Sequence, residues 1–207
     1  MTLLVVAAWE PELERFRTLA AALPAPPIAG GVGIGLVDAA IGTATLLARH
    51  RPSAVLLLGT CGAAPGSGLA IGDVVVGASI ALVDPSTCEG RAALPWSPTP
   101  IAPGDVAPFV GAGAVAATVA TTLGITTDDA LATTLAREAA TEHLEAYAVA
   151  RACALADVPC TVLLGITNVV GAAGRADWRA NHVAVSARVA DVAVQALRTS
   201  TRAPSPA

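Results

Sequence analysis

The sequence predicts one α/β domain built on a largely parallel β-sheet. Short apolar runs rich in β-branched residues alternate with helical patterns, which is the order expected of parallel strands joined by crossover helices. The length of 207 residues suits one large domain. Hydrophobic residues make up 54% of the chain and charged residues 14%, which supplies a sizeable core and excludes disorder over most of the length.

The first third of the chain predicts two buried strands and two helices. Thr2–Ala8 is short, apolar and β-branched, and the acidic residues after it suit the first turn of a helix, where Pro11 sacrifices no hydrogen bond. Leu36–His50 follows a glycine-rich segment and carries Ala and Leu on one face, so we expect a helix. Ala54–Leu58 predicts a second buried strand, closed by a Gly-Thr-Cys-Gly turn at 59–62.

The remainder of the chain contains one long loop and further alternating elements. Residues 84–108 are rich in Pro with few periodic apolar positions, and such long loops are often functional. We expect a single domain over residues 1–198 and a frayed tail over 199–207. The other predicted elements are a strand at Asp73–Val76, an ambiguous small-residue segment that could be a strand at Val110–Thr122, helices at Thr127–Ala140 and Ala146–Ala156, a buried strand at Pro159–Ile166 and a final helix at Asn181–Leu197.

Composition excludes several classes of function. The net charge is −4 and no basic run occurs, so no nucleic-acid partner is expected. All twelve basic residues are Arg, which excludes a Schiff-base or phosphate-loop lysine. The four cysteines form no CxxC pair and have no zinc-ligand spacing, so we expect neither a metal nor a cofactor. Without a signal-peptide pattern or a long apolar run, the chain is predicted to be cytoplasmic and to have no membrane partner.

Polar residues follow three of the predicted strands. Glu10 and Glu12 come after the first strand, Gly59–Gly62 after the second, and Thr167-Asn168 after Pro159–Ile166. Each has an ordinary structural explanation, since acidic residues suit helix starts and Thr-Asn is a common turn pair. The carboxyl ends of parallel strands nevertheless meet at one edge of a sheet, which is where ligands bind in open α/β folds. We therefore treat these residues together as a candidate site.

Three ordered segments resemble the nucleoside phosphorylase and nucleosidase superfamily. GIGLVDAA (Gly33–Ala40) resembles its GxGxxNAA segment, Leu56–Val76 is similar to its glycine turn plus a G-D-V-V-V strand, and Glu142–Gly171 resembles its E-x-M-E-A…VP…S-[DN] signature. The match covers most of the chain, with residues 77–125 poorly covered. The resemblance implies a three-layer αβα sandwich with a mixed, mainly parallel central sheet, a purine nucleoside as ligand, and a homo-oligomer.

Within the superfamily, the sequence favours hydrolysis over phosphorolysis. AAWEPELERF (Ala7–Phe16) resembles the nucleosidase start, whereas phosphorylases carry an Arg-containing phosphate loop there. Leu57 stands where phosphorylases place a second Arg, so charge-assisted phosphate contacts are missing. TNVVGAAGRADW (Thr167–Trp178) is similar to futalosine hydrolase, a nucleosidase family of menaquinone biosynthesis that releases hypoxanthine. Leu144 departs from the usual Met of E-x-M-E.

The resemblance assigns roles to individual residues. Glu145 would hold the ribose 2′- and 3′-hydroxyls, and Glu12 would orient or deprotonate the attacking water. Asn168 offers both a donor and an acceptor, which suits a 6-oxopurine better than adenine. The expected catalytic residues are thus Glu12, Glu145 and Asn168, and the expected substrate-binding residues are Thr60, Cys61, Gly62, Leu144 and Thr167.

Other functions stay open from the sequence alone. The chain could be a methylthioadenosine/S-adenosylhomocysteine-type nucleosidase, a phosphorylase with a different phosphate site, or a non-catalytic nucleoside sensor if Glu12 points away from the site. A dinucleotide-binding fold is not favoured, because no strand–GxGxxG–helix unit with a later acidic residue is present. His143 and His182 are expected on the surface or at helix ends, and Trp178 is expected mainly to pack the last loop.

Overall fold

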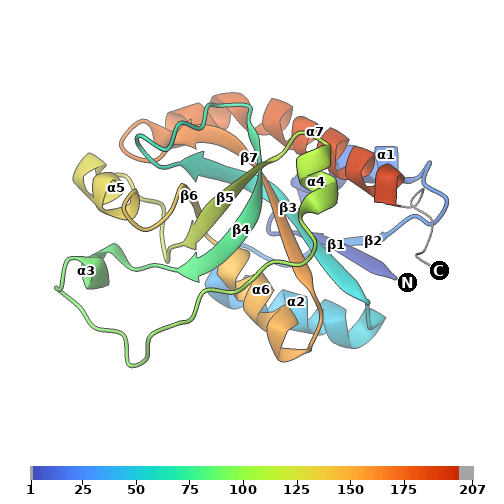
Figure 1. The fold of residues 1–207 in the computed structure, drawn as a ribbon, viewed down its shortest axis with the longest axis horizontal. Helices are drawn as coiled ribbons and strands as arrows, with labels where there is room; N and C mark the ends of the chain where they lie inside the picture. The colour runs from blue at the N-terminus through green and yellow to red at the C-terminus, as the bar shows by residue number, and fades with distance from the viewer. Residues whose placement is uncertain (1, 201–207) are drawn as a thin grey trace.

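Seven strands form one mixed sheet in the computed structural model, which describes residues 2–200 (Figure 1). The strand order is β2-β1-β3-β6-β5-β4-β7, and β3 also pairs with β7. Pairings are parallel except for β3 with β6 and β4 with β7, so the sheet is mixed and mainly parallel, as predicted. The strands are β1 (Leu3–Ala7), β2 (Ile28–Gly31), β3 (Ala54–Ala63), β4 (Val74–Leu82), β5 (Val115–Thr121), β6 (Thr141–His143) and β7 (Cys160–Val169).

Helices cover both faces of the sheet, which gives the three-layer αβα sandwich that the family resemblance implies (Figure 1). One layer contains α1, α4 and α7, and the opposite layer contains α2 and α6. The helical segments are the 3-10 helix η1 (Glu10–Leu13), α1 (Glu14–Ala20), α2 (Leu36–His50), α3 (Pro85–Cys88), α4 (Ala107–Gly111), α5 (Asp129–Leu135), α6 (Ala146–Leu155) and α7 (Gly174–Ser200).

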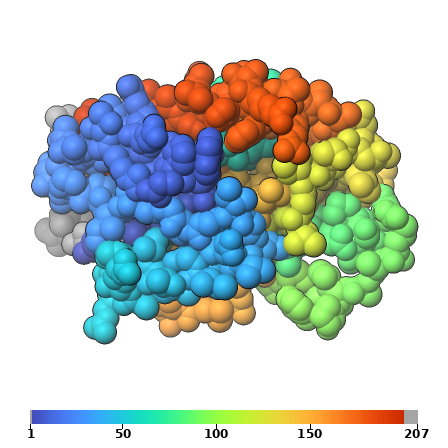
Figure 2. Space-filling model, turned by 180° about the vertical axis from the view of Figure 1, so that it is seen from behind, coloured from blue at the N-terminus to red at the C-terminus, as the bar shows by residue number. Residues whose placement is uncertain are grey.

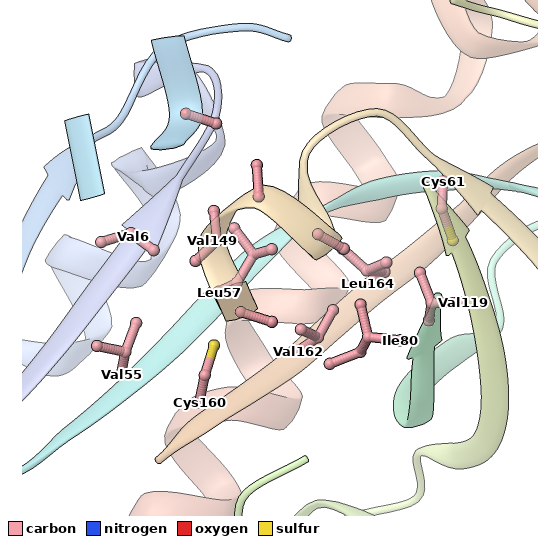
Figure 3. Close-up of a cluster of buried hydrophobic side chains, with 14 of the residues drawn as sticks. Val6, Val55, Leu57, Cys61, Ile80, Val119, Val149, Cys160, Val162 and Leu164 are labelled. Atoms are coloured by element: carbon pink, nitrogen blue, oxygen red, sulfur yellow. The ribbon is translucent and has the colours of Figure 1, made fainter. Parts of the chain in front are cut away.

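Each helical layer encloses a core of small, branched side chains. Figure 3 shows the cluster under α2 and α6, where Val6 of β1, Leu57 of β3, Leu164 of β7 and Val149 of α6 are fully buried. The second cluster lies under α1 and α7 and is centred on Phe16. Close packing on both faces fixes β1, β3 and β7 relative to one another, and the chain segments at their carboxyl ends build the candidate site.

Several predicted elements agree with the structure, and α2 has the predicted bounds. The predicted turn at Gly59–Gly62 is wrong, because these residues continue β3, and Thr167-Asn168 likewise lie inside β7. The helix predicted at Thr127–Ala140 is the shorter α5. The predicted tail is wrong at residues 199–200, which belong to α7, and residues 201–207 lie outside the described part of the chain.

The predicted long loop at 84–108 is largely confirmed. It contains the single turn of α3 and otherwise has little regular structure before α4 begins. The backbone of Ile101 pairs with Ile80 and ties the loop to β4. In Figure 2 these residues stand at one side of the molecule as a green lobe. Among residues 2–200, no helix combines the length and apolar character that crossing a membrane would require.

Candidate active site

A β-bulge shapes the edge of the sheet where the predicted polar residues meet. Cys61 of β3 pairs with Ile166 of β7, but the next residue, Gly62, pairs with Asn168. Thr167 is therefore an extra residue in β7, and such bulges redirect side chains at functional edges. The Thr167 hydroxyl lies 3.1 Å from the Cys61 carbonyl oxygen, to which it can donate across the irregular pairing.

All eight predicted site residues line one cavity of about 490 Å³. The structure thus brings together residues from four separate parts of the chain: Glu12, Thr60, Cys61, Gly62, Leu144, Glu145, Thr167 and Asn168. On the face shown in Figure 2, the blue N-terminal segments, the yellow segment near residue 125 and the orange start of α7 meet around this region. Wall residues that were not predicted as contacts include Trp9, Ile34, Ile125, His143 and Arg175.

Glu12 is a buried carboxylate with a fixed orientation. The 3-10 helix η1 begins directly after β1 with Pro11 in its first turn, and this short helix turns Glu12 inward. The Thr60 hydroxyl donates to Glu12 Oε1 at 2.8 Å, and Trp178 Nε1 in turn donates to the Thr60 oxygen at 3.2 Å. Burial raises the pKa of Glu12 to about 7, the nearby Glu145 adds to the increase, and the Thr60 hydrogen bond opposes it. A carboxylate with this pKa is suited to proton transfer near neutral pH.

Glu145 is the second buried carboxylate of the cavity. It stands immediately before α6, and the backbone N–H of Gly35 donates to its Oε1 at 2.8 Å. Gly35 has a φ of 85°, a left-handed conformation that glycine adopts without strain. The glycine-rich segment therefore serves as a main-chain donor for Glu145.

His143 is buried in the cavity wall, with 5% of its surface exposed, so the expectation of a surface position is wrong. Its Nδ1 accepts hydrogen bonds from the N–H groups of Glu145 and Ala146, both at 3.0 Å. An accepting nitrogen carries no proton, so the 3.4 Å approach of Nδ1 to Glu145 Oε2 is not an ion pair. Burial also lowers the pKa of His143. The ring is neutral and caps the start of α6.

Asn168 lines the same cavity and lies in a narrow space beside the bulge, between Gly62 and Gly174. Thr167 Oγ1 donates to Asn168 Oδ1 at 2.8 Å, and Asn168 Nδ2 donates to the Val169 carbonyl oxygen at 3.1 Å. A Cβ on Gly62 or Gly174 would stand 2.9 or 3.0 Å from Asn168 Nδ2, so these glycines make room for the amide. One N–H and one oxygen lone pair are left for a ligand.

Two tryptophan rings, Trp9 and Trp178, line the cavity, and His182 packs behind them. Trp178 stacks on His182 with ring centroids 4.3 Å apart, and Trp9 packs against both rings. Trp178 was expected to pack the last loop, but it lies in α7, lines the cavity and donates to Thr60. His182 lies within α7 and is half-buried, and its expected surface or helix-end position is wrong.

The remaining polar residues of the wall restrict the chemistry. Glu142 is buried and accepts hydrogen bonds from Thr122 Oγ1 and Thr126 N, which holds the segment that carries Ile125 at the cavity. Arg175 is the basic residue among the lining side chains and is exposed to solvent. Burial raises the pKa of the Cys61 thiol far above its ordinary value, which excludes a thiolate nucleophile at neutral pH. Among residues 2–200, no group of three or more His, Cys, Asp or Glu side chains is arranged to hold a metal.

The mixed sheet between helical layers and the carboxylate-lined cavity at its strand ends define the class of protein. A family model for the phosphorylase superfamily matches residues 9–202, so the chain belongs to that superfamily. The family resemblance inferred from the sequence is thereby confirmed. No curated protein sequence matches the chain significantly.

Solved structures of nucleosidases share the fold. A futalosine hydrolase mutant of Helicobacter pylori strain 26695 superposes with a TM-score of 0.84 at 17% identity, covering 96% of this chain and 99% of that chain. A 5′-methylthioadenosine/S-adenosylhomocysteine nucleosidase of Colwellia psychrerythraea 34H, in complex with adenine, gives 0.82 at 21% identity, covering 96% and 95%. The enzyme of this type from Neisseria meningitidis, with methylthio-immucillin-A, gives 0.81 at 21% identity, covering 96% and 99%.

Proposed function

We propose that the protein is a nucleosidase that hydrolyses the N-glycosidic bond of a purine nucleoside. The observation that carries the proposal is the pair of buried carboxylates, Glu12 and Glu145, facing one cavity that Asn168 also lines. Cleavage of this bond builds positive charge on the sugar and negative charge on the departing base. Two carboxylates at the sugar and an amide at the base match that distribution of charge.

The reaction uses water as the nucleophile. Glu12, ionised and held by Thr60, accepts a proton from water as the oxygen attacks C1′ of the sugar. The bond from C1′ to the purine nitrogen breaks, its electron pair stays on the base, and the base takes a proton from solvent. Glu12 returns its proton to solvent, so one water is consumed for each nucleoside cleaved. Glu145 Oε2 is available to accept hydrogen bonds from ribose hydroxyls, because the Gly35 N–H is directed at Oε1. Thr60 fixes the carboxylate that aligns the water.

A 6-oxopurine is the base that suits Asn168. The free N–H of its amide donates to O6 and its oxygen accepts from N7–H, whereas adenine offers an amino donor at position 6. This supports futalosine as substrate, with hypoxanthine and dehypoxanthine futalosine as products, ahead of a methylthioadenosine-type nucleoside. The fold likeness to a futalosine hydrolase agrees with this choice and equally with the adenosine-type nucleosidases.

Phosphorolysis and simple sensing are less well supported. Leu57 is fully buried in the core, and Arg175 at the cavity wall is exposed, so a built phosphate site is not evident among the lining side chains. A sensor would not need a buried carboxylate with a raised pKa facing the ligand, and Glu12 does face the cavity. The test is incubation with futalosine, inosine and methylthioadenosine, with and without phosphate. We expect free base without phosphate, fastest from futalosine; strict phosphate dependence would contradict hydrolysis.

A homo-oligomer is part of the proposal. Exposed apolar side chains occur at the cavity and on α2: Ile34 and Ile125 line the cavity, and Val37 and Ile41 of α2 are exposed, as is Leu123. Exposed apolar surface of this kind is typical of an interface. Light scattering should give at least the mass of a dimer, and Val37→Asp with Ile41→Asp should shift it towards one chain. A single-chain mass for the unaltered protein would contradict the oligomer.

A further inference from the structure

Gly59 brings two functional groups together that come from distant parts of the chain. A Cβ on this glycine would stand 3.1 Å from His143 Nε2 and 3.5 Å from Glu12 Oε2. Both atoms therefore occupy the space that a side chain at position 59 would need. No direct hydrogen bond or ion pair joins the two groups, but atoms that flank the same glycine Cα are within reach of one bridging water.

The contacts of His143 Nδ1 determine which ring nitrogen carries the proton. Nδ1 accepts from two main-chain N–H groups, so the neutral ring carries its proton on Nε2. Nε2 is thus a donor, and it lies beside the carboxylate oxygen of Glu12 that does not bind Thr60. The same Nδ1 contacts fix the start of α6, where Glu145 stands.

We propose that His143 is a positioning residue of this site: its Nε2–H donates to a water that bridges to Glu12 Oε2 across Gly59, and this links the general base Glu12 to the helix start that carries Glu145. The inference rests on the proposed function in taking Glu12 as the base. His143 keeps the carboxylate of Glu12 aligned and favours its ionised form, because a hydrogen bond to the charged state stabilises that state.

Other titratable groups near Glu12 also bear on its ionisation. Glu145 raises the pKa of Glu12 by repulsion, and burial raises it further. The Cys61 thiol stays protonated because burial raises its pKa. From α7, Arg175 lines the same cavity and His182 stacks on Trp178. A donor at His143 Nε2 therefore opposes the two effects that disfavour ionisation.

Two substitutions at His143 test the acceptor role of Nδ1 and the donor role of Nε2 separately. In His143→Asn the side-chain oxygen can still accept from the N–H groups that start α6, but the Nε2 donor is lost. In His143→Gln an amide N–H can reach the Nε2 position, while the acceptor for the helix start is lost. We expect His143→Asn to keep the melting temperature and His143→Gln to lower it.

The decisive readout is the pH profile of kcat/KM. His143→Asn should move the acid limb to higher pH by about one unit, which lowers kcat/KM on that limb about tenfold and leaves the high-pH plateau unchanged. His143→Gln should leave the limb in place. Gly59→Ala should reproduce the shift by separating the two groups. The matched control is Gly77→Ala, where a Cβ would have contacts of 3.4 Å or more with apolar side chains remote from the cavity.

The outcomes distinguish this inference from the proposed function. If the unaltered protein releases base but neither His143→Asn nor Gly59→Ala moves the acid limb, the positioning role is wrong. If the unaltered protein releases no base from any purine nucleoside, the proposed function fails. The inference is then judged by carbon-13 NMR titration of the Glu12 carboxyl in the free protein, where the same upward shift supports it and an unchanged pKa overturns it.

Discussion

Two regions of the cavity wall differ in charge. In the region around Gly59 and Gly35, Glu12 and Glu145 are buried carboxylates held by Thr60 and the Gly35 N–H, with His143 between the first residues of α6 and Gly59. In the region of the bulge, Asn168 is neutral and half-buried, and it bonds only to neighbouring residues. Burying two like charges is costly, whereas burying part of a hydrogen-bonded amide is not.

We propose that this difference in charge separates the residues that act in the reaction from the residue that selects the purine base. In the proposed reaction the charged region acts on the sugar and the water, which are common to the hydrolysis of every nucleoside, so changes there should affect all substrates alike. The neutral region contacts the purine base in the same proposal, so changes there should alter the choice between bases. The substitutions that follow test this division, beginning with the largest expected effect.

Removing the proposed general base, Glu12, should have the greatest effect on the reaction rate. Glu12→Gln keeps an acceptor for the Thr60 hydroxyl but cannot take a proton from water, so kcat should fall about 10²- to 10⁴-fold. The matched control is Glu14→Gln, two residues later and exposed, which should leave the rate unchanged. Steady-state release of free base measures both variants. A Glu12→Gln enzyme with near-normal kcat would place the base elsewhere.

Glu145→Gln should reduce the reaction of every purine nucleoside by a similar factor. The neutral amide keeps an acceptor for the Gly35 N–H but no longer stabilises the cationic sugar, and loss of one such electrostatic contact costs about 10²- to 10³-fold in kcat. The measurement is kcat/KM for inosine, futalosine and methylthioadenosine side by side. A loss confined to one base would show that Glu145 does not act on the shared ribose.

Asn168→Asp should change the ratio between substrates. The carboxylate lacks a donor for O6 and repels that oxygen when ionised, but it can still accept from or protonate N7 of adenine. Loss of one transition-state hydrogen bond costs about 2.7–4 kcal/mol, so the ratio of kcat/KM for 6-oxopurine to that for 6-aminopurine nucleosides should fall about 10²- to 10³-fold. An unchanged ratio would mean that Asn168 does not select the base.

The last prediction concerns stability, which Glu12→Gln should increase, whereas the preceding substitutions reduce activity. The folded-state pKa of Glu12 is about 7 against an ordinary 4.5, so the folded protein holds a proton that the unfolded chain loses between these values. Stability is therefore lost as pH rises through this window, by at most about 3 kcal/mol. Glu12→Gln removes the loss, so urea denaturation should find the variant more stable than the unaltered protein at pH 8 and equal to it at pH 4. Equal stability at both values would contradict the burial of this charge.

The fold was largely predictable because its strands and helices have strong local patterns. Leu36–His50 has apolar residues at helical spacing and forms α2 with the predicted bounds. β2 and β6 were missed because Ile-Ala-Gly-Gly and Thr-Glu-His carry no strand pattern, and they become strands only by pairing with β1 and with β3 and β5. Gly59–Gly62 were predicted as a turn from their composition, but pairing with β7 keeps them extended.

The candidate site was predictable in part. Glu12, Glu145 and Asn168 could be found because motifs of the superfamily mark them, and the structure places all three in one cavity. The role proposed for His143 could not be predicted from the sequence, because it depends on two main-chain N–H groups and on a glycine far away in sequence. Trp9 was also missed, although its position immediately before Glu10 and Glu12 is a local sequence signal for an aromatic residue beside the site.

The most direct test of the proposed chemistry follows the oxygen of water. The protein is incubated with futalosine in ¹⁸O-labelled water without phosphate, and the products are analysed by mass spectrometry. Hydrolysis predicts free hypoxanthine together with a sugar product that carries one labelled oxygen at C1′, and added phosphate should change neither the rate nor the products. Release of base only with phosphate, as an unlabelled sugar 1-phosphate, would contradict the account, and so would the absence of base from this and every other purine nucleoside.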